Sequence, residues 1–456
     1  MEELKTIAQL NDELTGYSCP ADDGTAKILD ACIITKVGRY GEYIAGIRLT
    51  LTRRLFCDAF RYDSTFRAFS TSSDRKIHAV YVSASGRIGD ASPSGKYIVI
   101  EFSDPFDDPI EYANHVTYRE ATRTREASLP ITVYIHQPLE TCGHEVIAPR
   151  SITTTHEECP DIDRFTYSFF EKEGAVEIYR ILYVPECYDG TAPIPLIVHF
   201  PSGDAAAVNQ NGLYTGALYR HPDATIWASD EVQKEHPAIV LSAGRAGGFK
   251  LPTRGTYYEA AYVRMINDVL NTYNIDRTRI YSVSLAAGTV NQWNVAEDYP
   301  DLFTAFISTT VSPFSAEQMR NDWRSPNAKP TDPEKVLADT AKLISNQPCW
   351  LFCGQRDPLG RENPYPNPGG QKNAMASVFT ILQERGVAVD LADEEKMWNG
   401  LIEGSEQAEA QIQRAAGKPM VTLFQPNTIL PNGHACWSSV YLNKRVRDWL
   451  FEQKKG

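Results

Sequence analysis

Short apolar runs, each rich in β-branched and aromatic residues, follow one another through the first third of the chain. Glycine, proline, serine and aspartate separate them, which is the pattern of strands joined by tight turns. The regular spacing favours an immunoglobulin-like sandwich, and we expect this all-β domain to cover residues 1–150. The polar, proline-containing stretch 137–164 is expected to be a linker. The runs are 26–35, 43–51, 79–83, 97–102 and 130–135.

The pattern changes in the second part of the chain, where strand-like runs alternate with helical segments. Residues 280–283 form a short β-rich run, and a helical segment continues from it to Tyr299. A further apolar run at 349–353 predicts a buried strand that ends in a loop, and 440–453 predicts a C-terminal helix. With 456 residues, the chain is long enough for two domains.

Four small residues lie within five positions after the run at 280–283: Ser284, Ala286, Ala287 and Gly288. A nucleophile elbow needs small residues two positions before and two after the nucleophile, because the strained turn brings the following helix close to the strand. Ser284 and Gly288 satisfy this spacing around Ala286, so the nucleophile position carries no hydroxyl. An alternative is that Ser284 is itself the nucleophile, although it would then still lie on the strand.

Several segments around this turn resemble α/β-hydrolases of the feruloyl-esterase-like and polyhydroxybutyrate-depolymerase-like esterase branch. The resemblance covers most of residues 165–450 and implies an α/β-hydrolase catalytic domain at 151–456. It also implies a serine in the family at the position of Ala286. Some esterases of this branch carry an immunoglobulin-like domain ahead of the catalytic one. The segments that carry the resemblance are 178–189, 195–203, 274–281 and 299–306.

A serine hydrolase of this fold needs an acid and then a histidine after the nucleophile. Asp357 follows the predicted strand at 349–353, and His434 precedes the C-terminal helix, so the two occur in the required order. The resemblance implies that His434 is the base and Asp357 its orienting partner.

The oxyanion of acyl transfer needs two hydrogen-bond donors. We expect the backbone N–H of Ala287 to be one, and that of Gly203 the other. The loop departs from the family here, since Pro201 and Ser202 stand where a His-Gly pair is usual. The expected substrate contacts are Ser202, Asp204 and Trp437.

Two explanations account for Ala286, an introduced serine-to-alanine replacement and a natural loss of the nucleophile. The retained Asp357 and His434 favour the first. The expected function is a carboxylic ester hydrolase acting on a small-molecule ester, in a form without its nucleophile. A pseudohydrolase that binds a ligand and a peptidase of the same fold remain alternatives. The segment 358–430 either caps the pocket or is an exposed insertion.

Composition changes this picture little. The net charge of −13, with both signs mixed along the chain, argues against nucleic acid or an anionic membrane as partner. The chain begins with acids and lacks the apolar core of a signal peptide, so a cytoplasmic protein is expected, although a secreted one without its leader is an alternative. The nine cysteines are scattered, so neither metal nor cofactor is expected. The oligomeric state is left open.

Overall fold

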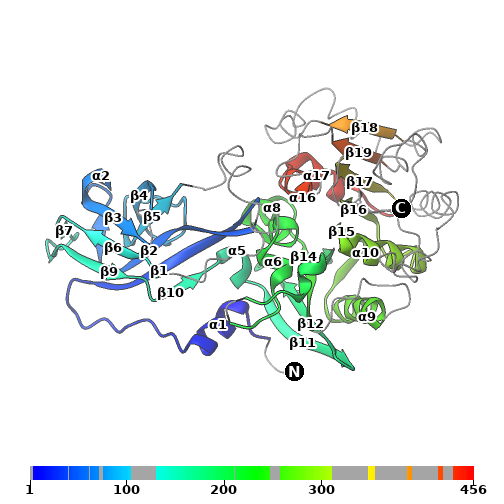
Figure 1. Cartoon of the computed structure of the whole chain (residues 1–456), viewed down its shortest axis with the longest axis horizontal. Helices are drawn as coiled ribbons and strands as arrows, with labels where there is room; N and C mark the ends of the chain where they lie inside the picture. Colours follow the sequence, from blue (N-terminus) through cyan, green and yellow to red (C-terminus); the bar gives the residue numbers. More distant parts are fainter. Residues whose placement is uncertain are drawn as a thin grey trace, which may run out of the picture. The chain divides into compact units, whose positions relative to one another are not determined.

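The computed structural model divides the chain into two compact units, one from Thr6 to Arg164 and one from Phe165 to Gly456 together with the first five residues (Figure 1). We describe each unit by itself. The residues that the structure describes are 4–39, 41–60, 62–70, 75–103, 130–209, 211–246, 257–310, 348–354, 388–392, 420–424 and 435–456.

The first unit is built mainly of strands. They form a five-stranded sheet in the order β10-β1-β2-β5-β4, a three-stranded sheet in the order β3-β6-β9, and the pair β7-β8. The strands are β1 (Ile28–Gly38), β2 (Gly41–Phe56), β3 (Phe66–Phe69), β4 (Ile77–Ser83), β5 (Ser94–Phe102), β6 (Thr132–Ile135), β7 (Leu139–Glu140), β8 (Val146–Ile147), β9 (Arg150–Thr153) and β10 (His156–Glu158). The helices are α1 (Ile7–Thr15), α2 (Tyr62–Thr65) and α5 (Pro160–Asp163).

The core of this unit lies between the two larger sheets. Alternate residues of the long strands, such as Ile33, Ile47 and Ile98, are buried together with Ala68 and Val133 of the smaller sheet. Because successive side chains of a strand point to opposite faces, this leaves a second face of the five-stranded sheet for other groups. That face carries a polar cluster that includes Cys32 and His156.

The expected strands of the first unit are present, but its C-terminal end differs from the expectation. The stretch 137–164 is not a linker, because β9 pairs with β6, and β10 pairs with β1. Backbone pairing therefore ties these residues to the sandwich, and the boundary between the units lies after Arg164 rather than near residue 150. The polar composition of the stretch concealed two short edge strands.

The second unit is a nine-stranded sheet with helices on both faces. Its strand order is β11-β12-β14-β13-β15-β16-β17-β19-β18, with antiparallel pairing from β11 to β14 and parallel pairing beyond. The strands are β11 (Thr166–Glu173), β12 (Val176–Tyr183), β13 (Ile194–Phe200), β14 (Ile239–Ala246), β15 (Ile275–Leu285), β16 (Ala305–Thr309), β17 (Cys349–Gly354), β18 (Ala388–Ala392) and β19 (Met420–Phe424). The helices are η1 (Gly203–Ala206), α6 (Gly216–Tyr219), α7 (Pro222–Thr225), η2 (Ile226–Ala228), α8 (Asp230–Glu235), α9 (Tyr257–Thr272), α10 (Ala287–Asp298), α16 (Trp437–Tyr441) and α17 (Lys444–Glu452).

The two faces of this sheet are covered by different helices (Figure 1). Helices α9 and α10 pack on one face, where Met265 and Trp293 join a core with Leu196 and Phe306. Helices α16 and α17 cover the other face, where Trp449 lies edge-on to Trp350 with 5.4 Å between ring centroids. This is the α/β-hydrolase architecture with its layers in place, and the first unit adds the immunoglobulin-like sandwich.

The C-terminal helix and the segment 358–430 of the second unit differ from, or go beyond, the expectation. The single C-terminal helix expected at 440–453 is two helices, because Asn443 ends the first and caps the second by accepting a hydrogen bond from the Arg445 N–H. Within the segment 358–430, β18 and β19 are described, and both extend the sheet. The rest of this segment lies outside the described residues, so the choice between a pocket cap and an exposed insertion stays open. Among the helices that the structure describes, none is long and apolar enough to span a membrane.

Candidate active site

The turn between β15 and α10 has a strained backbone. Ala286, between the strand and the helix, adopts φ 48° and ψ −114°. An L-residue holds such a positive φ only when the surrounding structure enforces it, at a cost of about 1–3 kcal/mol. A sharp strand-to-helix turn with one strained residue at its tip is the geometry of a nucleophile elbow. The strained position is 286, which is the position expected from the spacing of small residues.

Gly288 explains why the turn needs small residues. A Cβ atom at this position would collide with the carbonyl oxygens of Phe200 and Pro201. The first turn of α10 therefore lies directly against the backbone at the end of β13. Since these colliding atoms are backbone atoms, a larger residue could be accommodated only by moving the strand or the helix.

Ser284, the alternative nucleophile, has a different role. It is fully buried within β15, and its Oγ donates to Gln292 Oε1 at 2.6 Å and lies 3.1 Å from Thr289 Oγ1. Gln292 in turn donates to the hydroxyl of Ser282. The Ser284 hydroxyl thus belongs to a closed network that ties α10 to the sheet, which argues against a role in attacking a substrate.

Neighbouring strand ends hold the elbow in place. The Ala286 N–H donates to Thr310 Oγ1 at 2.9 Å and to the Thr309 carbonyl at 3.2 Å, and Thr310 itself has a positive φ of 51°. On the other side, the Tyr441 hydroxyl donates to the Ser284 carbonyl at 2.6 Å and accepts from the Ser284 N–H at 3.1 Å. Burial raises the pKa of Tyr441 far above its usual value, so this hydroxyl stays neutral and can donate.

Tyr441 also connects the elbow to the C-terminal helices. It is the last residue of α16, which begins at Trp437. The two residues before this helix, Ala435 and Cys436, are buried. His434 directly precedes them in the chain. Asp357 and His434 themselves lie outside the described residues, so their roles stay predictions. The described part of the chain brings β17, three residues before Asp357, into the same parallel sheet as β15.

The expected oxyanion donors lie at adjacent strand ends. Ala287 is the first residue of α10, where backbone N–H groups have no acceptor within the helix. Gly203 begins η1 directly after β13, which pairs with β15 so that Phe200 faces Ser284. The contact between Gly288 and Phe200 places the two segments together. Their action on an oxyanion remains a prediction.

The three expected substrate contacts differ in their exposure to solvent and in whether the structure describes their side chains. Ser202 is partly buried in the loop after β13, and the side chain of Asp204 lies outside the described part. Trp437 is only 1% exposed, and its ring packs edge-on against His221 with centroids 4.8 Å apart. This is the environment of a core residue, so the structure gives Trp437 a packing role instead of an open substrate contact.

A second histidine–aspartate pair was missed in the sequence. His199 on β13 is fully buried, with Nε2 2.7 Å from Asp223 Oδ2 and Nδ1 2.8 Å from Ser242 Oγ. Asp223 lies in α7 and Ser242 in β14. Sequence alone could not pair them, because the three residues are separated by 24 and 43 positions. Both ring nitrogens are committed to protein groups, so this triplet is structural.

Comparison with known proteins supports the two-part architecture. Residues 30–148 match the family model of the esterase Ig-like N-terminal domain. No curated protein sequence matches the chain.

Among solved structures, a thermostable esterase has 20% sequence identity and a TM-score of 0.65, over 93% of this chain and all of that one. A serine-to-alanine mutant of the feruloyl esterase module from Clostridium thermocellum, complexed with sinapinate, has 12% identity and a TM-score of 0.37, over 65% of this chain and 90% of that one. An S-formylglutathione hydrolase from Staphylococcus aureus has 10% identity and a TM-score of 0.34, over 63% of this chain and 98% of that one. The first likeness shows a shared fold across both units.

The chain therefore combines an N-terminal domain that matches the esterase Ig-like model with an α/β-hydrolase fold in its second unit. The expectation drawn from the resemblance is confirmed at this level.

Proposed function

We propose that this chain is a carboxylic ester hydrolase of the serine type that lacks its nucleophile at position 286. The observation that carries the proposal is the backbone of Ala286. Its positive φ costs free energy and does nothing for an alanine. The same strain is useful when a serine occupies the tip, because it exposes the hydroxyl above the sheet. The Ig-like esterase domain and the shared fold of a thermostable esterase support the choice of an ester as substrate.

The mechanism would follow the order of acyl transfer. A serine at 286 would attack the ester carbonyl while His434 takes its proton and passes it to the leaving alcohol, which leaves the acyl group on the serine. Water, deprotonated by His434, would then attack this acyl-enzyme, and His434 would return the proton to the serine as the carboxylic acid leaves. Asp357 fixes the tautomer of His434 and stabilises the imidazolium. The N–H groups of Ala287 and Gly203 bind the oxyanion. With Ala286, the attacking oxygen is missing, whereas the rest of the fold is unaffected because the change removes one hydroxyl.

An introduced replacement of the serine and a natural loss both account for Ala286. The ordered presence of Asp357 and His434 favours the first. The second candidate function is a pseudohydrolase that holds a ligand without cleaving it. The strained elbow favours neither origin, because the backbone conformation is the same for both.

The decisive experiment is the Ala286→Ser variant of the full chain, assayed on p-nitrophenyl acetate and longer p-nitrophenyl esters. We expect the unaltered chain to be inert and the variant to turn over roughly 10⁴ to 10⁶-fold faster, which is the scale of losing a triad serine. Adding Ser284→Ala to Ala286→Ser is the matched control and should leave turnover within about tenfold, since Ser284 is structural.

Two outcomes would contradict the proposal. A folded Ala286→Ser variant without esterase activity would favour the pseudohydrolase. Activity on a peptide p-nitroanilide together with none on the esters would favour a peptidase of the same fold.

A further inference from the structure

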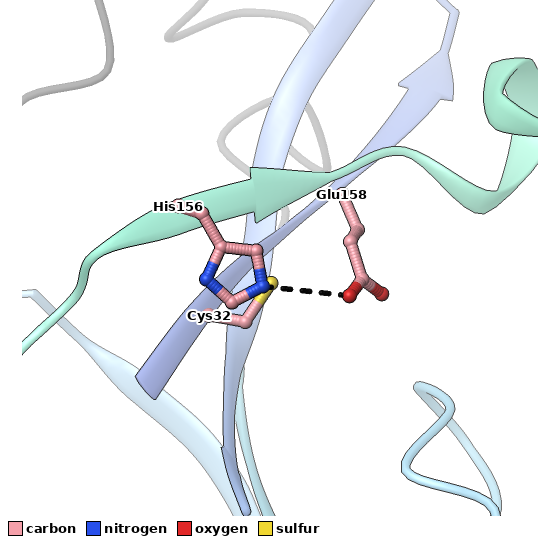
Figure 2. A group of neighbouring side chains, drawn as sticks. All are labelled: Cys32, His156 and Glu158. Atoms are coloured by element: carbon pink, nitrogen blue, oxygen red, sulfur yellow. Dashed lines mark ion pairs between the residues drawn. The ribbon is translucent and has the colours of Figure 1, made fainter. Parts of the chain in front are cut away.

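A cluster of three possible metal ligands lies in the first unit, far in sequence from the elbow (Figure 2). Cys32 on β1 faces His156 on β10 in the parallel pairing, and Glu158 follows His156 by two residues on the same face of the strand. This is the face of the five-stranded sheet opposite the hydrophobic core. The three side chains come together because register and alternation both place them there.

The distances suit a small cation. The Sγ of Cys32, a ring nitrogen of His156 and a carboxylate oxygen of Glu158 all lie within 4.8 Å of one another. The His156 Nε2 is 3.5 Å from Glu158 Oε1, longer than a good hydrogen bond. Bonds of about 2.0–2.3 Å to one zinc ion require donors roughly 3.3–3.8 Å apart, so small side-chain rotations would close the site.

We propose that Cys32 Sγ, His156 Nε2 and Glu158 Oε1 bind one Zn²⁺ ion, with water in the fourth position. A thiolate, an imidazole and a carboxylate are the donors that zinc takes in proteins. The Glu158 side chain is 35% exposed while that of His156 is 9% exposed, so solvent and the ion enter from the Glu158 side.

Outer groups hold these ligands in orientation. The His156 Nδ1 lies 3.1 Å from Thr155 Oγ1, and this hydroxyl donates to Asp30 Oδ1 at 2.7 Å, so a carboxylate stands behind the histidine through one hydroxyl group. The ring of Tyr17 stacks on His156 with centroids 3.7 Å apart.

Arg48 holds the carboxylate of Glu158 through two hydrogen bonds, of 2.7 and 2.5 Å. Each oxygen of the Glu158 carboxylate therefore accepts a hydrogen bond from Arg48, which fixes the orientation of the carboxylate beside His156 and Cys32.

A second cluster of possible ligands differs, because a lysine side chain already lies between its carboxylates. Glu235, His236 and Asp448 also bring their polar atoms within 4.8 Å. The Lys444 ammonium, however, lies 2.6 Å from Glu235 and 2.9 and 3.0 Å from the two oxygens of Asp448. A protein cation thus already joins both carboxylates there. In the first cluster Arg48 is hydrogen-bonded to one member, Glu158, so we propose metal binding only for the first.

The test uses the full chain after removal of metal with a chelator and desalting. Co²⁺ is added first, because a thiolate ligand to Co²⁺ gives a charge-transfer band in the near ultraviolet, and Zn²⁺ is then titrated against it. We expect about one equivalent of Co²⁺ to produce the band and Zn²⁺ to remove it. Cys32→Ser should abolish the band and weaken Zn²⁺ binding by roughly 100-fold or more.

Cys159→Ser is the matched control, because Cys159 is also a buried thiol of the first unit and should leave the band unchanged. The proposal is overturned if the unaltered chain gives no thiolate band, or if the band persists in Cys32→Ser and so comes from another thiol. Should Cys32→Ser fail to fold, Glu158→Gln decides instead, since unchanged Zn²⁺ affinity in that variant would also contradict the site. None of these outcomes depends on hydrolase activity.

Discussion

Two histidines, His199 fully buried in the second unit and His156 partly buried in the first, differ in how their ring nitrogens are used. Both nitrogens of His199 are held at 2.7 and 2.8 Å by Asp223 and Ser242. The Nε2 of His156 has a looser neighbour in Glu158 at 3.5 Å, and Cys32 is close by. A histidine whose nitrogens are both committed is part of the scaffold, whereas one with a loosely held nitrogen beside other donor atoms can bind a ligand.

The same distinction applies to the elbow. The hydroxyl of Ser284 is committed to Gln292 and Thr289, so it stabilises the packing of α10 on the sheet. Position 286 is held through its backbone N–H by Thr309 and Thr310, so the hydroxyl of a serine proposed at this position would not be needed to hold the turn. In both units, therefore, the candidate functional positions are held in place by their neighbours but are not tied up in short side-chain hydrogen bonds.

The largest expected effect is a difference in the free energy of unfolding between variants of the two histidines. His199→Leu should lower the free energy of unfolding by about 3–5 kcal/mol, because it leaves Asp223 buried without its partner. His156→Leu should cost about 1 kcal/mol or less in metal-free protein, since Asp30 keeps Tyr17 and Thr155 as partners. Urea unfolding of the full chain measures both losses, with far-ultraviolet circular dichroism reporting on the two units and tryptophan fluorescence on the second unit, which contains all seven tryptophans.

Equal losses in the two variants would break the comparison. A large loss of unfolding free energy in His156→Leu alone would mean that the His156 cluster is a structural element of the sandwich, as the His199–Asp223 pair is in the second unit. The control for burial is Ser242→Ala, which removes only one hydrogen bond from His199 and should cost about 1 kcal/mol.

A somewhat smaller effect tests how tightly the elbow is built. Gly288→Ala should cost about 1–3 kcal/mol, because its Cβ meets the carbonyl oxygens of Phe200 and Pro201. Gly174→Ala is the matched control: Gly174 has a positive φ of 60° but open space around its Cβ position, so it should cost about 1 kcal/mol. In the Ala286→Ser background, Gly288→Ala should also reduce kcat, whereas Gly174→Ala should not. A smaller stability loss at Gly288 than at Gly174 would show that the close approach is not rigid.

The sequence predicted much of the elbow because its requirements are local. The approach of α10 to β13 requires a glycine at position 288, and the spacing of the small residues at 284, 287 and 288 can be seen without a structure. The alternating strands of the sandwich were visible for the same reason, since burial of one face demands a period of two. The break at Asn443 was missed because a single capping residue interrupts an otherwise continuous helical pattern.

The rest depends on contacts between distant parts of the chain. Cys32 and His156 are 124 positions apart, and only the parallel pairing of β10 with β1 brings them together. The short strand β10 has the sequence His-Glu-Glu, with no apolar residue, and it lies at the edge of the sheet. The same polar composition made 137–164 resemble a linker. No local rule marks such residues, so neither the strand nor the cluster could be predicted.

The first unit also contains a carboxyl group with a raised pKa, that of Asp163 near the end of the unit. Asp163 in α5 is partly buried, and the loss of solvent around its carboxyl group, together with the charges of Glu158, Glu42 and Asp12, raises its pKa to about 7 in spite of the hydrogen bond it accepts from the Cys159 N–H. The usual value is 3.8. Between these two values the unfolded chain loses the proton while the folded chain keeps it, so stability falls as the pH rises from about 4 to about 7.

The smallest expected effect follows from removing this titration. Asp163→Asn keeps an oxygen for the Cys159 N–H but carries no charge, so the variant should melt a few degrees higher than the unaltered chain at pH 8 and at nearly the same temperature at pH 4. Scanning calorimetry at several pH values checks this. Asp23→Asn in the same unit is the opposite control, because hydrogen bonds from Lys27 and Thr25 lower the pKa of Asp23, and its removal should bring no gain at pH 8. A gain for Asp163→Asn that is the same at pH 4 and pH 8 would mean that packing, and not the buried charge, limits the stability of α5.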